Sequence, residues 1–180
     1  MTLTPQQRAV YQAIVHGQRS TGPQHFPLLD AQGHLQGPFG LMVEVPDIGG
    51  PLQELGAALR YHTALTARER EIAILTVARC TASDFERHAH EAVGRAIGLT
   101  DTELTALHEG TFTTPDPREQ AIATLSAQLT THPLTTPADL PATDILDRAS
   151  VIEVTTLAGY YRTLSQLMGI FGIGAPELRD

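Results

Sequence analysis

The sequence of 180 residues contains no lysine, because all 12 of its lysine-plus-arginine positions are arginine. The absence of lysine excludes Schiff-base chemistry, a P-loop lysine and covalent attachment of pyridoxal. Asparagine is also absent, so the chain has no site for N-glycosylation. The only cysteine is Cys80, and a single cysteine rules out an internal disulfide.

Long apolar runs and clusters of basic residues are missing too. No apolar run approaches the roughly 20 residues that span a bilayer, and the first residues lack the charged and apolar regions of a signal peptide. The formal net charge of -8 argues against binding to nucleic acid or to an anionic membrane. We therefore expect a cytoplasmic globular protein with a single domain over residues 1–180.

The segment 66–110 has the clearest helix signals in the chain. A Ser or Thr followed three residues later by Glu marks a helix start, and this pattern occurs three times, as Thr66-x-x-Glu69, Ser83-x-x-Glu86 and Thr100-x-x-Glu103. Gly98 and Gly110 stand where left-handed helix ends are expected. The sequence therefore predicts three short helices, of which the first is apolar on almost every side and should be buried.

The rest of the chain also favours helices. Hydrophobic periodicity predicts them near 5–17, 51–62, 117–132 and 147–171, with no convincing strand. Residues 18–50 are rich in Gly and Pro, and we expect an irregular, structured loop there. Loops of this length are usually functional or disordered. Thr136-Pro137 and Leu140-Pro141 mark turns or a brief helix.

Three ionisable residues should converge between the first two central helices. Glu71 lies on an apolar helix face, where a carboxylate needs a partner, and Glu86 lies one turn before His90. The bend between the helices is short, so we expect a carboxylate oxygen within hydrogen-bond or one-water reach of the His90 ring. Glu86 would raise the pKa of His90 towards or above neutral. Alternatively, Glu71 is a structural carboxylate paired with Arg68, Arg70 or Arg79.

These residues resemble the core motif of the carboxymuconolactone decarboxylase and alkylhydroperoxidase D family. The resemblance rests on Arg70-Glu71, Ser83-x-x-Glu86, His90 and Gly98-Leu99, and extends more weakly over residues 37–171. In the peroxidase branch, a CxxC pair stands between the Glu and the His. Here Ser83 and Glu86 occupy those two positions, and Cys80 comes three residues too early.

The resemblance implies an all-α fold, an alkylhydroperoxidase D-like bundle of about seven to eight helices. It also implies a homo-oligomer, either a trimer or hexamer or a dimer, that acts on a small molecule. We expect no cofactor and no metal, because His88 and His90 lack the spacing of a metal-binding helix.

Three functions are compatible with this pattern. The first is a cofactor-independent lyase for a small carboxylate or lactone, in which His90 moves a proton, Glu71 and Glu86 set its charge, and arginines hold the substrate carboxylate. The second is a peroxidase that uses Cys80 and an outside thiol. The third is a non-catalytic small-molecule-binding protein. Ser83, Cys80 and Tyr160 are supporting candidates, each with a structural alternative: a helix cap, a buried inert thiol and a core residue.

Overall fold

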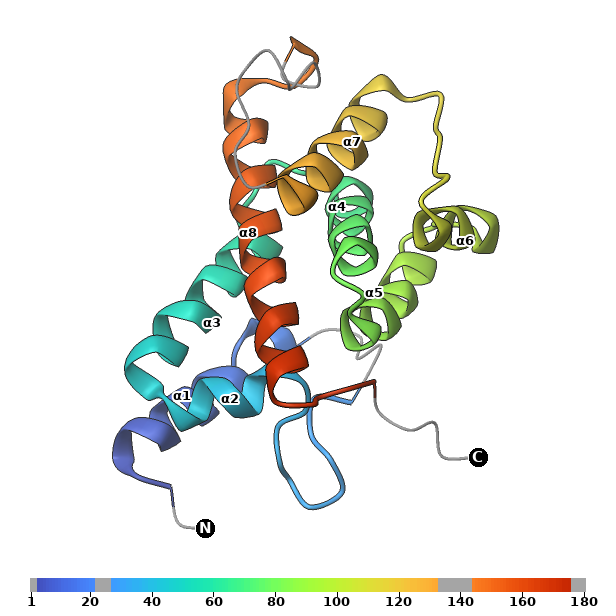
Figure 1. The fold of residues 1–180 in the computed structure, drawn as a ribbon. Coiled ribbons are helices and arrows are strands. Elements are labelled where there is room, and N and C mark those ends of the chain that lie inside the picture. Colours follow the sequence, from blue (N-terminus) through green and yellow to red (C-terminus); the bar gives the residue numbers. More distant parts are fainter. Residues whose placement is uncertain (1–2, 22–26, 133–143, 176–180) are drawn as a thin grey trace.

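The computed structural model describes residues 3–21, 27–132 and 144–175 (Figure 1). Within these ranges the chain forms eight α-helices, one short 3-10 helix and a single isolated β-bridge, between Leu29 and Leu35. The helices are α1 (Pro5–Val15), η1 (Gln18–Ser20), α2 (Pro38–Glu44), α3 (Pro46–Tyr61), α4 (Ala67–Cys80), α5 (Asp84–Ala96), α6 (Asp101–Glu109), α7 (Pro117–Thr131) and α8 (Arg148–Ile170). The predicted all-α class is confirmed, and the turns expected at 136–141 lie outside the described residues.

None of the helices in the described ranges combines the length and the apolar character needed to cross a membrane.

Helix α4 lies in the middle of the bundle, where it packs against α5, α6, α7 and α8 (Figure 1). Every residue from Glu71 to Ala78 is buried, as the apolar pattern predicts. One side of α4 joins the main core through Ile74 and Val77, together with residues of α7 and α8. Another side joins a smaller cluster with α6 through Ile72 and Leu75. Because α4 touches four helices, it sets the geometry of everything that faces it.

Arginine–carboxylate pairs tie the start of α4 to its neighbours. Arg68 pairs with Glu103 of α6, and its Nε lies 2.7 Å from Oε1 of Glu119 in α7. In the opposite direction, Arg118 of α7 pairs with Glu69 of α4. The two arginines are partly exposed, whereas Glu69 and Glu119 are buried. Because water still reaches the guanidinium groups, each pair contributes modestly on its own. Together they fix the register of α4 against α6 and α7.

The expectation of an irregular loop over 18–50 is wrong for its second half. Helix α2 occupies 38–44, and α3 begins at Pro46 rather than near Pro51. The first half does contain η1, the bridge between Leu29 and Leu35, and turns, while residues 22–26 lie outside the described ranges. Gly37, at φ 60°, turns the chain, and Pro38 then starts α2.

Tertiary packing explains why Gly49, Gly50 and Pro51 lie inside α3 although each is a helix breaker. A Cβ on Gly49 would lie 1.8 Å from the carbonyl oxygen of Met42, so the backbones of α2 and α3 touch at this point. Only glycine permits so close an approach. Since burial of α2 against α3 depends on this contact, long-range packing overrides the local preference of the sequence.

The two adjacent glycines offer a matched test of this contact. We expect Gly49→Ala to lower the free energy of unfolding by about 1–3 kcal/mol, because its Cβ meets fixed backbone atoms. Gly50→Ala is the control: the nearest atom to its Cβ is Cγ2 of Val10 at 3.7 Å, an ordinary contact. This control should leave stability unchanged or raise it by about 0.5–1 kcal/mol. Urea denaturation measures both, and equal effects of the two substitutions would contradict the proposed contact.

Candidate functional site

Glu71, Glu86 and His90 come together between α4 and α5. Oε2 of Glu71 lies 2.6 Å from Nδ1 of His90, and Oε2 of Glu86 lies 3.5 Å from Nε2 of the same ring. The three residues are 1%, 3% and 5% exposed, so the cluster is almost sealed from bulk water. The predicted convergence is confirmed. The alternative partner Arg68 is engaged with Glu103 and Glu119 instead.

The two carboxylates determine the charge of His90. Burial alone lowers the pKa of His90, because a charged imidazole loses its hydration. Attraction to Glu71, the hydrogen bond to Glu71 and the weaker contact with Glu86 outweigh this loss and raise the pKa from 6.5 to about 9. The predicted direction is confirmed, and at neutral pH His90 is an imidazolium held between two acidic side chains.

Glu86 departs from the capping pattern of its own sequence motif. At the starts of α4 and α6, the Glu turns back to the backbone N–H of the cap residue and closes a full capping box. At the start of α5, Ser83 accepts a hydrogen bond from the backbone of Glu86 at 3.4 Å, but the Glu86 carboxylate turns inward to His90. The predicted role of Ser83 as a cap is confirmed. A full capping box is absent there because the ring of His90 takes the carboxylate.

A small cavity borders His90 and Glu86. Its volume is about 30 Å³, room for about one water molecule. Residues from η1, α2, α3, α5 and α8 line it: Arg19, Pro38, Phe39, Arg60, Phe85, Glu86, Ala89, His90, Tyr160, Tyr161 and Leu164. Oε1 of Glu86 is buried and has no hydrogen-bond partner in the described part of the chain. A free acceptor, a charged imidazole and two guanidinium groups therefore surround the same small space.

The loop before α2 closes this cavity from one side. A Cβ on Gly37 would lie 2.2 Å from Cζ of Phe85, so the Phe85 ring of α5 rests directly on the Gly37 backbone. The contact brings Pro38 and Phe39 over the cavity, and the guanidinium carbon of Arg19 lies 5.2 Å from the centre of the Phe39 ring. The Gly-rich segment thus contributes to the site through packing.

Two tyrosines of α8 form the opposite wall. The ring of Tyr161 meets His90 edge-on, with the ring centres 5.2 Å apart, and Tyr160 meets Tyr161 in the same way at 5.3 Å. Burial is the main cause that raises the pKa of Tyr160 to about 12, although contact with Arg19 opposes it. Burial, together with Glu86 and Glu71, also raises the pKa of Tyr161 well above 10.0. Both hydroxyls therefore stay protonated at neutral pH. Tyr160, a supporting candidate with a core residue as its alternative, is buried and lines the cavity.

Cys80 lies elsewhere. It ends α4 and lines a separate open groove, with Thr81, Thr130, Arg162 and Ser165 among its neighbours. The thiol is half-buried, and burial raises its pKa, although the nearby charge of Arg79 works in the other direction. A thiol with a raised pKa has less of the nucleophilic thiolate. The structure therefore does not bring Cys80 together with Glu71 and His90.

The sequence pattern does not single out Arg19, Arg60 or Tyr161 as site residues. Arg19 and Arg60 reach the cavity only because η1 and α3 fold over α5 and α8. A weak signal existed, because Arg19 opens a long Gly- and Pro-rich segment of the kind that often serves function. Within the described residues no group of three or more His, Cys, Asp and Glu side chains has the arrangement of a metal site.

Comparison with known proteins relates the segment that carries this site to a family. Residues 46–128 match the model of the carboxymuconolactone decarboxylase family, and this stretch contains Glu71, Glu86 and His90. No curated protein matches the chain by sequence.

Solved structures share the fold at low sequence identity. The chain is similar to the debrominase Bmp8, both in the apo form and as a cysteine-to-alanine variant in complex with 2,3,4-tribromopyrrole. In each case the TM-score is 0.72 and the identity is 11%, with 96% of this chain and 87% of that chain covered. It is also similar to an alkylhydroperoxidase AhpD core protein, an uncharacterized peroxidase-related protein from Ralstonia eutropha JMP134. Here the TM-score is 0.69 and the identity 14%, covering 87% of this chain and 95% of that one.

Identities this low establish the fold alone, whereas the family model covers the helices that carry the acidic pair and the histidine. Residues 46–128 thus match the model of the carboxymuconolactone decarboxylase family, and the described chain has an alkylhydroperoxidase D-like helical fold.

Proposed function

We propose that this protein is a cofactor-independent lyase that removes carbon dioxide from a small carboxylated lactone or a related carboxylate. The observation that carries the proposal is the charged His90, held at Nδ1 by Glu71 at 2.6 Å and bordered at Nε2 by Glu86 at 3.5 Å, in the lining of a cavity that also contains two arginines. Decarboxylation needs a proton donor for the carbon that loses the carboxylate, and an imidazolium supplies one near neutral pH.

The proposed step balances without a cofactor. The bond between the carboxylate and its carbon breaks, and its electron pair moves into the conjugated carbonyl system of the substrate. The imidazolium of His90 then donates its Nε2 proton to carbon and becomes neutral. Glu71 keeps Nδ1 protonated and the ring in place, as a carboxylate–imidazole pair does in other proton-transfer sites. Solvent finally returns the proton to His90.

In this proposal Arg19 and Arg60 bind the carboxylate of the substrate. They enter from η1 and α3 and line the same cavity as His90 and Glu86. A guanidinium group binds a carboxylate through two parallel hydrogen bonds. The imidazolium of His90 and the two guanidinium groups outnumber the carboxylates of Glu71 and Glu86, so the cavity attracts a negatively charged ligand.

The small size of the cavity adds a requirement. A space of about 30 Å³ holds water but no lactone. Substrate binding therefore requires the lining side chains to move apart. Arg19 is the lining residue on the shortest helix, because η1 has only three residues. When these side chains close again over a bound substrate, they exclude water from the reacting carbon.

The thiol alternative has less support in the geometry. Reversible thiol peroxidase chemistry needs an accessible thiolate and a second sulfur. Cys80 has a raised pKa, lies in a separate groove and is the only sulfhydryl of the chain. The binding-protein alternative predicts affinity without turnover, and the experiment below separates it from the lyase.

Mutation of the site should abolish turnover in a defined order. With carboxymuconolactone as the test substrate and carbon dioxide release as the measurement, we expect His90→Gln to lower kcat by about a hundredfold or more. Arg60→Gln should mainly raise KM. Cys80→Ser and chelator-treated wild-type protein should keep full activity.

Tight binding without release of carbon dioxide would favour the binding-protein alternative. Loss of activity on chelation, restored by addition of a metal, would contradict the cofactor-independent mechanism.

The charge of His90 should also appear in the pH dependence of stability. Its folded pKa of about 9 lies above the ordinary value of 6.5, so protonation of His90 stabilises the folded chain. This contribution is complete below about pH 6.5 and is lost as the pH rises through about 9. We expect the free energy of unfolding to lose about 3 kcal/mol across this interval, as followed by urea denaturation.

Variants identify the group responsible for that loss. His90→Gln should remove the dependence, and Glu86→Gln should narrow the interval because one of the two carboxylates that raise the pKa is gone. The exposed His108, replaced by Gln, is the control and should retain the wild-type profile. A wild-type profile in His90→Gln would show that another group titrates in this interval.

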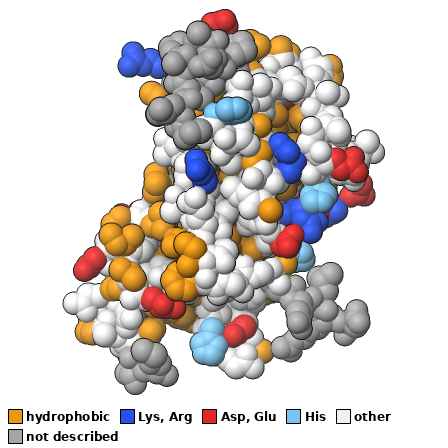
Figure 2. All heavy atoms as spheres, in the orientation of Figure 1, with side chains coloured by type: hydrophobic (Ala, Val, Ile, Leu, Met, Phe, Trp, Pro, Cys, Tyr) orange, Lys and Arg blue, Asp and Glu red, His pale blue; other side chains and the backbone are white. Residues whose placement is uncertain are grey.

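We further propose that the protein assembles as a homo-oligomer through an apolar surface on α2, α3 and the end of α8. Figure 2 shows hydrophobic side chains gathered on the side where α3 and the lower part of α8 lie. Val45, Ile48, Ile170 and Phe171 are 56%, 65%, 76% and 60% exposed. Covering apolar groups this exposed with a second copy of the chain lowers the free energy, because it removes apolar surface from water.

A charge in this surface should weaken the assembly. We expect Ile48→Glu to raise the dissociation constant by about tenfold or more, because an isoleucine loses its burial and a charge is placed in the interface. Ile152→Glu is the control, since Ile152 is 58% exposed but lies near the start of α8, outside this surface. Light scattering after size exclusion measures both. A monomeric wild-type protein at high concentration would contradict the proposal.

A further inference from the structure

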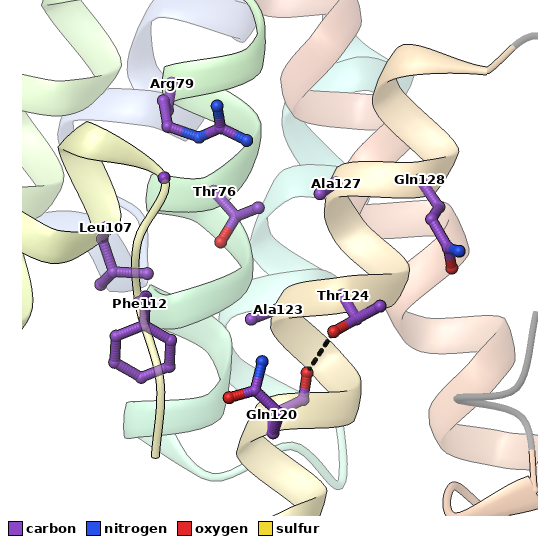
Figure 3. A pocket seen from close by; sticks show the side chains of 10 residues that line it. Thr76, Arg79, Leu107, Phe112, Gln120, Ala123, Thr124, Ala127 and Gln128 are labelled. Carbon is purple, nitrogen blue, oxygen red and sulfur yellow. Dashed lines mark hydrogen bonds between the residues drawn. The ribbon is translucent and has the colours of Figure 1, made fainter.

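A second cavity lies between α4, the end of α6 and α7 (Figure 3). Its volume is about 260 Å³, much larger than the space beside His90, and it is partly open. No residue lines both cavities. Thr76, which lines the second one, is five residues after Glu71 and so points about 140° away from it around the helix axis. The residues of this cavity are Thr76, Arg79, Leu107, Gly110, Phe112, Gln120, Ala123, Thr124, Ala127 and Gln128.

Arg79 supplies the positive charge of this cavity. None of the ion pairs found in residues 3–21, 27–132 and 144–175 involves Arg79. Its Nη2 donates to the Sγ of Cys80 at 3.2 Å, and a thiol is a weak acceptor. A Cβ on Gly110 would lie 2.9 Å from Nη1, so the guanidinium group rests on the glycine backbone at the end of α6. The charge is thus held in place by packing rather than by a carboxylate.

The neutral polar groups of the cavity have defined hydrogen-bonding roles. Oε1 of Gln120 accepts from the backbone N–H of Thr114 at 3.2 Å, which leaves its amide NH₂ as a donor. The hydroxyl of Thr76 donates to the carbonyl of Ile72 at 2.7 Å, and that of Thr124 donates to the carbonyl of Gln120 at 2.9 Å. Arg79 and Gln120 therefore offer hydrogen-bond donors to the cavity. These donors suit a ligand that carries acceptor oxygens.

The remaining wall is apolar. Leu107 and Phe112 stand on one side in Figure 3, and Ala123 and Ala127 of α7 face them. The alanines leave the space open, because larger side chains one turn apart on α7 would fill it. Recognition of a small ligand by an apolar wall with a few placed polar groups is the usual design of binding pockets. At about 260 Å³ the cavity is smaller than the pockets that take drug-sized molecules.

We propose that this second cavity binds a small organic anion with a flat apolar body, of the class of the aromatic carboxylates. The carboxylate would lie on Arg79, within reach of the amide of Gln120, and the ring would lie between Phe112 and the alanines of α7. Such a site is separate from the proposed lyase site, and the inference does not depend on that activity.

Titration of the isotope-labelled protein with benzoate tests the site directly. We expect saturable shifts of the backbone amide signals of Thr76, Gly110 and Ala123 in two-dimensional NMR spectra. Benzamide, which has the same shape without the charge, should bind at least about tenfold more weakly, because it cannot form charge-assisted hydrogen bonds with Arg79. The Arg60→Gln variant should show the same shifts as wild type, since Arg60 belongs to the other cavity.

Two variants and one control assign the binding to this cavity. Arg79→Gln should weaken benzoate binding by about tenfold or more, and Ala127→Leu should abolish the shifts by filling the space. Arg95→Gln removes an exposed arginine outside the cavity and should bind as wild type does. Thermal unfolding confirms that each variant is folded, and if one is not, the other together with benzamide still decides the question.

Several results would overturn the proposal. Shifts confined to residues around His90 would place benzoate in the other cavity. Undiminished binding by Arg79→Gln, or equal binding of benzamide, would remove the charge from the recognition. The absence of any saturable shift with wild-type protein would leave Arg79 only a structural role at the end of α6.

Discussion

The hydrogen bond between Glu71 and His90 is the interaction on which the rest of the site depends. Glu71 lies 1% exposed in the central helix, where an unpaired charge would cost several kcal/mol. It therefore needs a cation at close range, and α5 supplies one at 2.6 Å. This requirement fixes how α5 lies against α4. It also keeps His90 charged in a space that would otherwise make it neutral, so one contact sets both the packing and the acid–base chemistry.

Glu86 contacts His90 in place of one capping hydrogen bond at the start of α5. Three helix starts share the same capping motif, and two of them close both hydrogen bonds. The third gives one of them up, because the Glu86 carboxylate lies 3.5 Å from Nε2 of His90 instead. Its second oxygen stays unsatisfied within the described chain. A local rule that holds twice and fails once, beside a buried charged pair, is typical of a functional position.

The central position of α4 allows the small bundle to hold two separate cavities. One side of the helix carries Glu71 and faces α5 and α8, and another carries Thr76 and faces α7. Salt bridges of Arg68 and Arg118 hold the start of the helix, so the two sides keep a fixed relation. The cavities differ in kind: one is nearly closed around a charged histidine, and the other is open, larger and carries a single arginine.

Local signals in the sequence determined most of the helices and the heart of the site. Capping residues and apolar periods lie within a few residues of one another, and the short bend after Cys80 brings Glu71 level with His90. Only the tertiary structure decided what long-range packing controls. Helix α3 starts at Pro46 because glycine lets it touch α2. Arg19 and Arg60 reach the site only when distant segments of the chain fold over it. The cavities form where helices far apart in sequence leave the space between them unfilled. No local pattern records such contacts, because their energy appears only when the elements meet.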